Sequence, residues 1–215
     1  MKKKIIGIVI SVLLVFVLVV GGVYASKNMS FFQWGGQMAE MQSKQSPSTT
    51  IATVNGVEIP KSRFDSYKIG LANSGKKFTD AQILDKLIQQ EIIMQEITRL
   101  GYVTTDSEVD DFNEQRFSLL NDDPTAYQIV KDYVDGLGIT IDEYKEMSKE
   151  ISRVALLTNK YKSDMLKEFE KQDSSVQTYS QNEKTTRFEE YFNNKIEMLK
   201  KEAHVEIEKL KINKI

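Results

Sequence analysis

Four pairs in this sequence, each a Ser or Thr followed three residues later by a Glu or Gln, mark the predicted starts of helices. In such a capping box, the hydroxyl and the longer side chain each satisfy a backbone N–H group that the first helical turn leaves unpaired. The four pairs are Thr79–Gln82, Thr105–Glu108, Thr140–Glu143 and Thr186–Glu189. These helix starts predict a fold built mainly of α-helices.

Proline and glycine residues mark the remaining helix boundaries. Asp123–Pro124 is a further start, and Gly101 and either Gly136 or Gly138 stand where helices should end. The expected helices lie near 61–73, 80–100, 106–120, 124–136, 141–170 and 186–202. The helix at 80–100 is apolar on more than one face, so it should be the most buried one. The helix at 141–170 carries an apolar stripe and should pack along another helix, within this chain or in a second copy.

A short β-hairpin is expected at 51–60. Apolar residues alternate around Asn55–Gly56, and this dipeptide readily adopts the positive φ angles of a tight hairpin turn. A lone hairpin is only marginally stable in water. Residues 204–207 alternate in the same way, and we expect them to add a third strand and complete a small antiparallel sheet. Residues 209–215 would then form a C-terminal tail.

The beginning of the chain is typical of a membrane segment. Three lysines at 2–4 precede an uncharged apolar run from Ile5 to Val23, which as a helix would span roughly 28 Å. Residues 1–25 are therefore predicted to be a signal-anchor, in which residues 5–24 contact the bilayer, the lysines stay in the cytoplasm and the folded domain lies outside it. The alternative is a signal peptide cleaved near Ala25, which would release a secreted protein.

Residues 26–50 are rich in Gln, Ser, Thr and Gly and are predicted to form a flexible linker. Phe31, Phe32 and Trp34 interrupt this polar composition and are expected to lie outside the folded domain, which would begin at Ile51. Aromatic side chains next to an apolar segment are typical of the outer headgroup layer of a membrane. The alternative is that they are ordinary apolar residues of a linker.

Composition argues against several kinds of site. The chain has no cysteine, which excludes disulfides, thiolate catalysis and zinc–thiolate sites. Its formal net charge is −2 and it has no basic stripe, which argues against nucleic acid as a partner. His204 is the only histidine, and nothing in the pattern supplies the oriented partner and nucleophile that a catalytic base needs. Acidic residues at 106–111 and 122–123 sit at helix starts and do not follow a calcium-loop pattern. We therefore expect no catalytic residue, metal site or cofactor.

Several stretches in order resemble one family. "ATVNGVEIPKSRFDSY", "LDKLIQQEIIMQEITRLGYVTTDSEVDDF" and "GITIDEYKEMSKEISRVALLTNKY" resemble the N-terminal chaperone domain of SurA/PrsA-type foldases, and "FEEYFNNKIEMLKKEAHVEI" resembles its closing helix and strand. The resemblance covers residues 51–208 apart from about 172–185. It implies a multi-helix extracytoplasmic chaperone domain that holds unfolded polypeptides in an apolar crevice.

The sequence departs from that family in two ways. The foldases usually carry a parvulin prolyl-isomerase domain before the closing helix, and here residues 171–186 form a polar stretch too short to fold independently. A parvulin active site is typically a cluster of histidines, an acid or cysteine, and aromatic residues. This chain has one histidine and no cysteine, so it cannot build such a cluster. The Gram-positive members are typically anchored through a lipid-modified cysteine, a role that the apolar leader would take here.

Aromatic residues on the two helices around 121–127 are the candidate peptide-binding site. They are Phe112, Phe117, Tyr127 and Tyr133. A crevice for unfolded chains needs exposed apolar surface that adapts to many sequences. The alternative is that residues at such spacing belong to the core.

The function expected from these observations is a membrane-anchored extracytoplasmic holdase for unfolded or newly secreted proteins, without isomerase activity. One alternative is an assembly or scaffold protein that uses the same domain to bind one specific partner. A prolyl isomerase with an unrecognised site is a second alternative. The sequence leaves the clients and the oligomeric state open.

Overall fold

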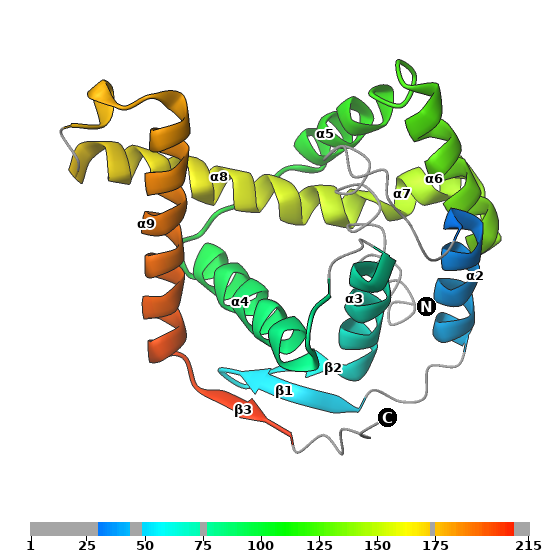
Figure 1. The fold of residues 1–215 in the computed structure, drawn as a ribbon, viewed down its shortest axis with the longest axis horizontal. Helices are drawn as coiled ribbons and strands as arrows, with labels where there is room; N and C mark the ends of the chain where they lie inside the picture. The colour runs from blue at the N-terminus through cyan, green and yellow to red at the C-terminus, as the bar shows by residue number, and fades with distance from the viewer. Residues whose placement is uncertain (1–29, 44–48, 74–76, 173–174, 209–215) are drawn as a thin grey trace.

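The computed structural model describes residues 30–43, 49–73, 77–172 and 175–208, and these form a mainly helical fold with a small antiparallel sheet (Figure 1). In chain order the elements are α2 (Phe31–Ser43), β1 (Thr50–Val54), β2 (Val57–Pro60), α3 (Lys61–Asn73), α4 (Asp80–Arg99), α5 (Asp106–Ser118), α6 (Pro124–Leu137), α7 (Ile141–Met147), α8 (Lys149–Gln172), the 3₁₀ turn η1 (Val176–Thr178), α9 (Gln181–Glu202) and β3 (Val205–Ile207).

The sheet joins the two ends of the domain. Its strand order is β2-β1-β3 with antiparallel pairing throughout, and Val54 lies opposite both Val57 and Val205. Asn55 and Gly56 close the hairpin with φ angles of 51° and 81°. Asn55 also holds β3, because its side-chain oxygen accepts the N–H of His204 at 2.8 Å. The predicted hairpin and its third strand are confirmed.

Three of the predicted capping boxes are confirmed, those that begin at Thr79, Thr105 and Thr140. The fourth was wrong. Helix α9 begins five residues earlier than predicted, where Ser180 and Glu183 form the box. Both pairs match the pattern, and the helix begins at the first because neither glycine nor proline separates them.

The predicted helix at 141–170 is two helices, α7 and α8, which meet at Ser148. The Ser148 hydroxyl donates to the carbonyl oxygen of Tyr144 at 2.7 Å, and the Ser148 N–H is shared between the carbonyl oxygens of Tyr144 and Lys145. Serine back-bonding of this kind bends helices. The apolar stripe itself continues across the break, with Tyr144, Ile151 and Tyr161 buried.

Buried side chains form three apolar clusters in two lobes. The first cluster lies among α2, α5, α6, α7 and the start of α8, and we call this part the α2–α6 lobe. The second and third clusters lie among the sheet, α3, α4, α9 and the C-terminal part of α8. We call these elements together the sheet lobe. Helix α4 contributes to both clusters of the sheet lobe and buries seven residues, as predicted for the central helix. Helix α8 runs through both lobes, and Ile69 of α3 also packs on the first cluster.

The prediction that residues 26–50 form a flexible linker was wrong for 31–43. These residues form α2, whose Trp34 and Met38 side chains are buried in the α2–α6 lobe. The Trp34 and Tyr133 rings lie 5.1 Å apart, so Trp34 belongs to the core and not to a membrane surface. The local signal for this helix is a further capping box, in which Ser30 and Gln33 exchange two side-chain to backbone hydrogen bonds.

Two glycines allow α2 to pack directly against α6. A methyl group on Gly35 would lie 2.1 Å from the carbonyl oxygen of Tyr133, and one on Gly136 would lie 2.1 Å from that of Phe32. Gly136 therefore belongs to the interior of the helix pair, and Gly138, with a φ angle of 74°, ends α6. This contact makes α2 an integral part of the domain.

The predicted signal-anchor at 1–25 and the tail at 209–215 lie outside the described residues. Within the ranges that the structure describes, no helix combines the length and apolar composition needed to cross a bilayer. The predicted linker at 171–186 contains the end of α8, η1 and the start of α9. Val176 in η1 is buried, so the described part of this stretch is a packed turn between two helices.

Candidate functional site

The four predicted peptide-binding aromatics do not share one surface. Phe117 and Tyr133 are buried in the α2–α6 lobe, where each ring packs edge-on against Tyr144. The prediction that they contact a peptide was therefore wrong, because they complete the apolar core. Phe112 is partly exposed beneath the Arg116 guanidinium group, and Tyr127 is exposed on α6. These two remain available to a partner.

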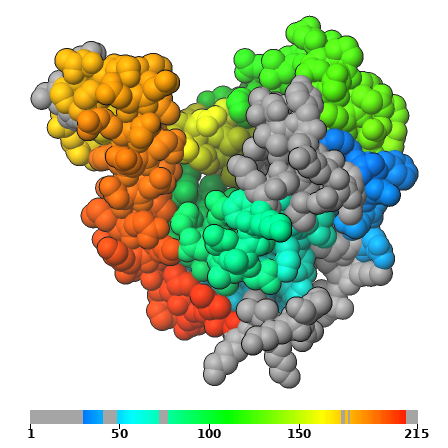
Figure 2. Space-filling view, in the orientation of Figure 1, coloured from blue at the N-terminus to red at the C-terminus, as the bar shows by residue number. Residues whose placement is uncertain are grey.

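A broad hollow separates the lobes on one face of the molecule. Figure 2 shows it between the arm formed by the end of α8 and the start of α9 and the opposite mass of α5 and α6, with α8 across its floor. Near the start of α8, every residue from 153 to 158 is partly exposed, between the buried Ser152 and the buried Tyr161, and Leu157 packs on the edge of the third cluster. We call residues 153–158 the bridge segment. Its sequence, RVALLT, is mostly apolar.

One wall of the hollow, α5, is held to α7 and α8 by polar contacts. Asn113 is almost fully buried, and its amide group donates to the Lys145 carbonyl oxygen at 2.9 Å and accepts from the Ser152 hydroxyl at 2.8 Å. Arg116 donates to the same hydroxyl oxygen at 2.9 Å. Burial lowers the pKa of the Arg116 guanidinium group. A buried network of this kind fixes the position of α5 when all its members are satisfied.

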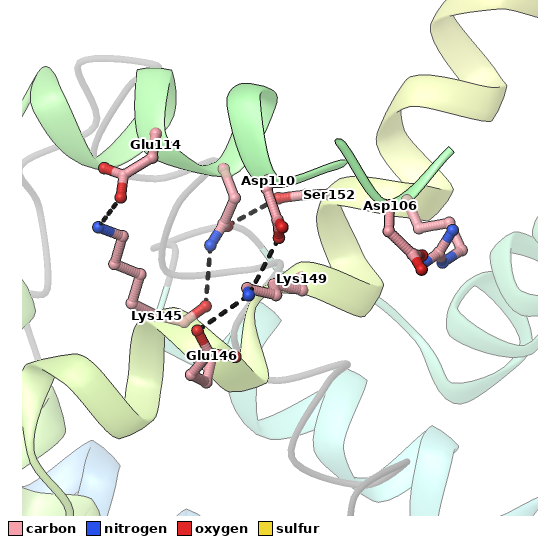
Figure 3. Close-up of polar contacts among 9 residues, drawn as sticks. Asp106, Asp110, Glu114, Lys145, Glu146, Lys149 and Ser152 are labelled. Carbon is pink, nitrogen blue, oxygen red and sulfur yellow. Dashed lines mark hydrogen bonds and ion pairs between the residues drawn. The ribbon is translucent and has the colours of Figure 1, made fainter. Parts of the chain in front are cut away.

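Ion pairs surround that buried network (Figure 3). Lys149 lies between Asp110 and Glu146, at 3.0 and 2.9 Å, and Lys145 pairs with Glu114. Further along α8, Arg153 pairs with Asp106 and Lys160 with Glu108, both at 2.7 Å. The Lys160 ammonium group and the Thr105 N–H lower the pKa of Glu108. Acidic side chains on α5 thus face basic side chains on α7 and α8, which sets the register between the helices.

A small pocket of about 350 Å³ lies elsewhere, where the hairpin turn meets the ends of α4 and α9. Ile92, Leu199 and Ala203 provide its apolar lining, and Asn55, Gln95, Glu96, Arg99 and Glu202 its polar lining. Arg99 donates to both carboxylate oxygens of Glu96, at 2.6 and 2.8 Å, and this lowers the pKa of Glu96. Asn55 donates to Gln95 at 2.8 Å, so these four polar side chains are already engaged with one another.

His204 and the acidic residues behave as local structural groups. His204 is exposed beside Glu206, with its Nε2 atom 2.9 Å from the Glu206 carboxylate, and Asp123 caps α6 through the backbone N–H groups of Thr125 and Ala126. Among the described residues, no group of three or more potential metal-ligating side chains comes together.

Comparison with known proteins does not assign a function to this chain. A scan against models of protein families finds no match for this chain, and a search of curated proteins also finds none. The candidate site is therefore the hollow crossed by α8, together with the partly exposed bridge segment of that helix and the partly exposed Phe112 on α5. Its geometry suits reversible contact with an extended apolar polypeptide, through surface complementarity.

Proposed function

We propose that this protein is an extracytoplasmic chaperone of the holdase type, which binds unfolded or newly exported polypeptides and is anchored in the membrane through residues 5–24. The observation that carries the proposal is the partly exposed apolar bridge segment between two lobes that each have their own core. Apolar surface in a hollow can bury a client segment without covalent chemistry or a cofactor. Anchoring would raise the local concentration of this surface where translocated chains emerge.

The sheet topology also supports the proposal. A hairpin from the start of the domain pairs with a strand from its end, which is the arrangement that the resemblance to SurA/PrsA-type foldases implies. The position of the foldases' isomerase domain is occupied here by a short packed turn. We therefore propose binding without prolyl-isomerase activity, and a proline-limited refolding assay is expected to show no acceleration.

The test is suppression of aggregation of several unrelated unfolded proteins by the purified chain. Leu156→Lys introduces a charge into the bridge segment while keeping an aliphatic stem, and it should weaken protection several-fold. Ala155→Glu, in the same segment, is a second variant in case the first perturbs folding. Met198→Lys is the matched control, because Met198 is 57% exposed on α9, outside the bridge segment.

Equal protection by all these variants, once thermal unfolding shows that they are folded, would contradict a role for the bridge segment. If the chain protects no unfolded protein and crosslinking in intact cells traps a single constant companion, the scaffold function replaces the holdase function. Crosslinking of many exported proteins supports the holdase.

A further inference from the structure

Two uncharged stretches from distant parts of the sequence meet at one end of the α2–α6 lobe. Residues 28–39 and residues 136–141 contain no Asp, Glu, Lys or Arg. They meet because α2 packs directly on α6 at Gly35 and Gly136, with the Phe32 carbonyl next to Gly136. In a chain with 28% charged residues, this juxtaposition leaves one end of the lobe without charges from either stretch.

The side chains at this end are apolar and incompletely covered. Phe31, Leu137 and Ile139 are only partly buried and pack on the edge of the first cluster, and Phe32 is 57% exposed in the first turn of α2. We call these four residues the apolar end. A single exposed phenylalanine is ordinary on a protein surface, but four adjoining apolar residues on two uncharged segments indicate a contact surface.

The chain itself indicates what covers this surface. The apolar run that begins at Ile5 ends at Val23, eight residues before α2 begins at Phe31. Eight residues span at most about 29 Å when fully extended. If residues 5–23 cross a bilayer, the start of α2 is held within that distance of its outer surface. Phe31 and Phe32 form the start of α2, and residues 28–39 carry no charge. Both properties favour partial burial of this end of the lobe at the boundary between lipid headgroups and acyl chains.

We propose that the apolar end rests on the outer surface of the lipid bilayer and so fixes the orientation of the domain on the membrane. This inference depends on the proposed membrane anchor, and it adds a second, weaker membrane contact made by the folded domain itself. The rigid packing of α2 on α6 would transmit the position of Phe32 to the whole α2–α6 lobe. The hollow would then face translocated chains in a defined direction.

The absence of cysteine allows a direct test on the full-length chain. Phe32→Cys, labelled with an environment-sensitive fluorophore, is reconstituted into vesicles of phosphatidylcholine and phosphatidylglycerol. Val103→Cys and Met198→Cys are controls, because these residues are 74% and 57% exposed on other parts of the molecule. Quenchers attached to lipid chains should quench the label at position 32 several-fold more strongly than the control labels, and iodide in the water should do the reverse. Leu137→Cys, also in the apolar end, repeats the measurement if Phe32→Cys folds poorly.

The outcomes separate this inference from the proposed function. If the protein sediments with vesicles but iodide quenches position 32 as strongly as position 103, the apolar end does not rest on the bilayer, and the inference is overturned while the anchor stands. If the chain does not sediment with vesicles, the anchor and the inference both fail. The aggregation assay in solution is independent of either result, because it measures client binding by the hollow.

Discussion

At the scale of single residues, Gly35 and Gly136 decide how the α2–α6 lobe is built. A Cβ atom at either position would lie within 3 Å of backbone atoms of the other helix, and backbone cannot move aside as a flexible side chain can. Gly36, next in sequence, has only one neighbour, at 3.8 Å, which is an ordinary contact distance. Adjacent glycines therefore have different roles, and the stability of Gly→Ala variants should distinguish them.

Gly136→Ala should destabilise the domain by about 2–4 kcal/mol, because separating two helices costs more than the gain in helix propensity. Gly36→Ala should be neutral or stabilise by up to about 1 kcal/mol, since only the propensity changes. Urea unfolding followed by the fluorescence of Trp34, which is the only tryptophan, measures both. Equal effects of the two substitutions would show that α2 does not pack closely on α6.

Among the helices, α5 buries only three residues, Val109, Asn113 and Phe117. Its attachment relies on one buried amide and on exposed ion pairs, and these have different energetic weight. Exposed pairs contribute little, because water and salt screen them. A buried polar group that loses its partner carries its full desolvation cost.

Asn113→Ala should therefore lower the free energy of unfolding by about 2–3 kcal/mol, because it leaves the Ser152 hydroxyl and the Lys145 carbonyl without the Asn113 amide. Glu114→Ala, on the same helix, removes only a surface ion pair and should cost less than about 1 kcal/mol. Hydrogen exchange of α5 amides, compared with those of α4, measures where the loss occurs. A larger effect of Glu114→Ala would contradict this account of the α5 attachment.

The helix caps make stability depend on pH. The pKa of Glu143 is lowered by the backbone N–H and hydroxyl of Thr140, and the pKa values of Glu108 and Glu183 are lowered with a contribution from their own caps. A carboxylate whose pKa is lower in the folded state stabilises the protein at pH values above its unfolded-state pKa. That stabilisation is lost as the pH falls through the folded-state pKa.

In Glu143→Gln the capping box can still form, because the box at Thr79 already uses a glutamine, Gln82, at the same position. The substitution removes only the titrating carboxyl group. The stability difference between the unchanged protein and this variant should shrink as the pH falls from neutral into the acid range. Thermal unfolding across that range measures it, with Glu189→Gln in the middle of α9 as a matched loss of one charge. A difference that does not vary with pH would contradict the lowered pKa of Glu143.

For the molecule as a whole, the sheet pairs distant parts of the chain, while α8 and Ile69 of α3 join the two lobes. Strand β3 pairs only with β1 among the described strands, and the Asn55 side chain links it to the hairpin turn. Removing β3 should therefore weaken the sheet lobe, even though it contains few residues. The effect should reach β1, which lies about 150 residues earlier in the chain and pairs directly with β3.

Deletion of residues 204–215 should lower the melting temperature by about 5–10 °C, from the loss of about 2–3 kcal/mol of strand hydrogen bonds and Val205 burial. Deletion of residues 209–215 alone is the control, because it leaves β3 intact. Circular dichroism during heating measures both. Identical melting curves for the two deletions would show that β3 contributes nothing to the domain.

Features with local causes could be predicted from the sequence. Capping boxes at Thr79, Thr105 and Thr140, and the Asn55–Gly56 turn, satisfy their backbone groups within a few residues, so the helical class and the hairpin could be predicted. Even α2 had a local signal, at Ser30 and Gln33. The mainly helical fold and its small sheet follow from these short-range interactions.

Which apolar residues are buried and which are exposed depends on how the helices pack. Phe117 and Tyr133 resemble Phe112 and Tyr127 in the sequence, but only the first pair lies against Tyr144. Trp34 belongs to the core because a glycine a hundred residues away, Gly136, lets two helices approach. Burial depends on contacts between segments that are distant in the chain, and single-sequence patterns do not specify those contacts.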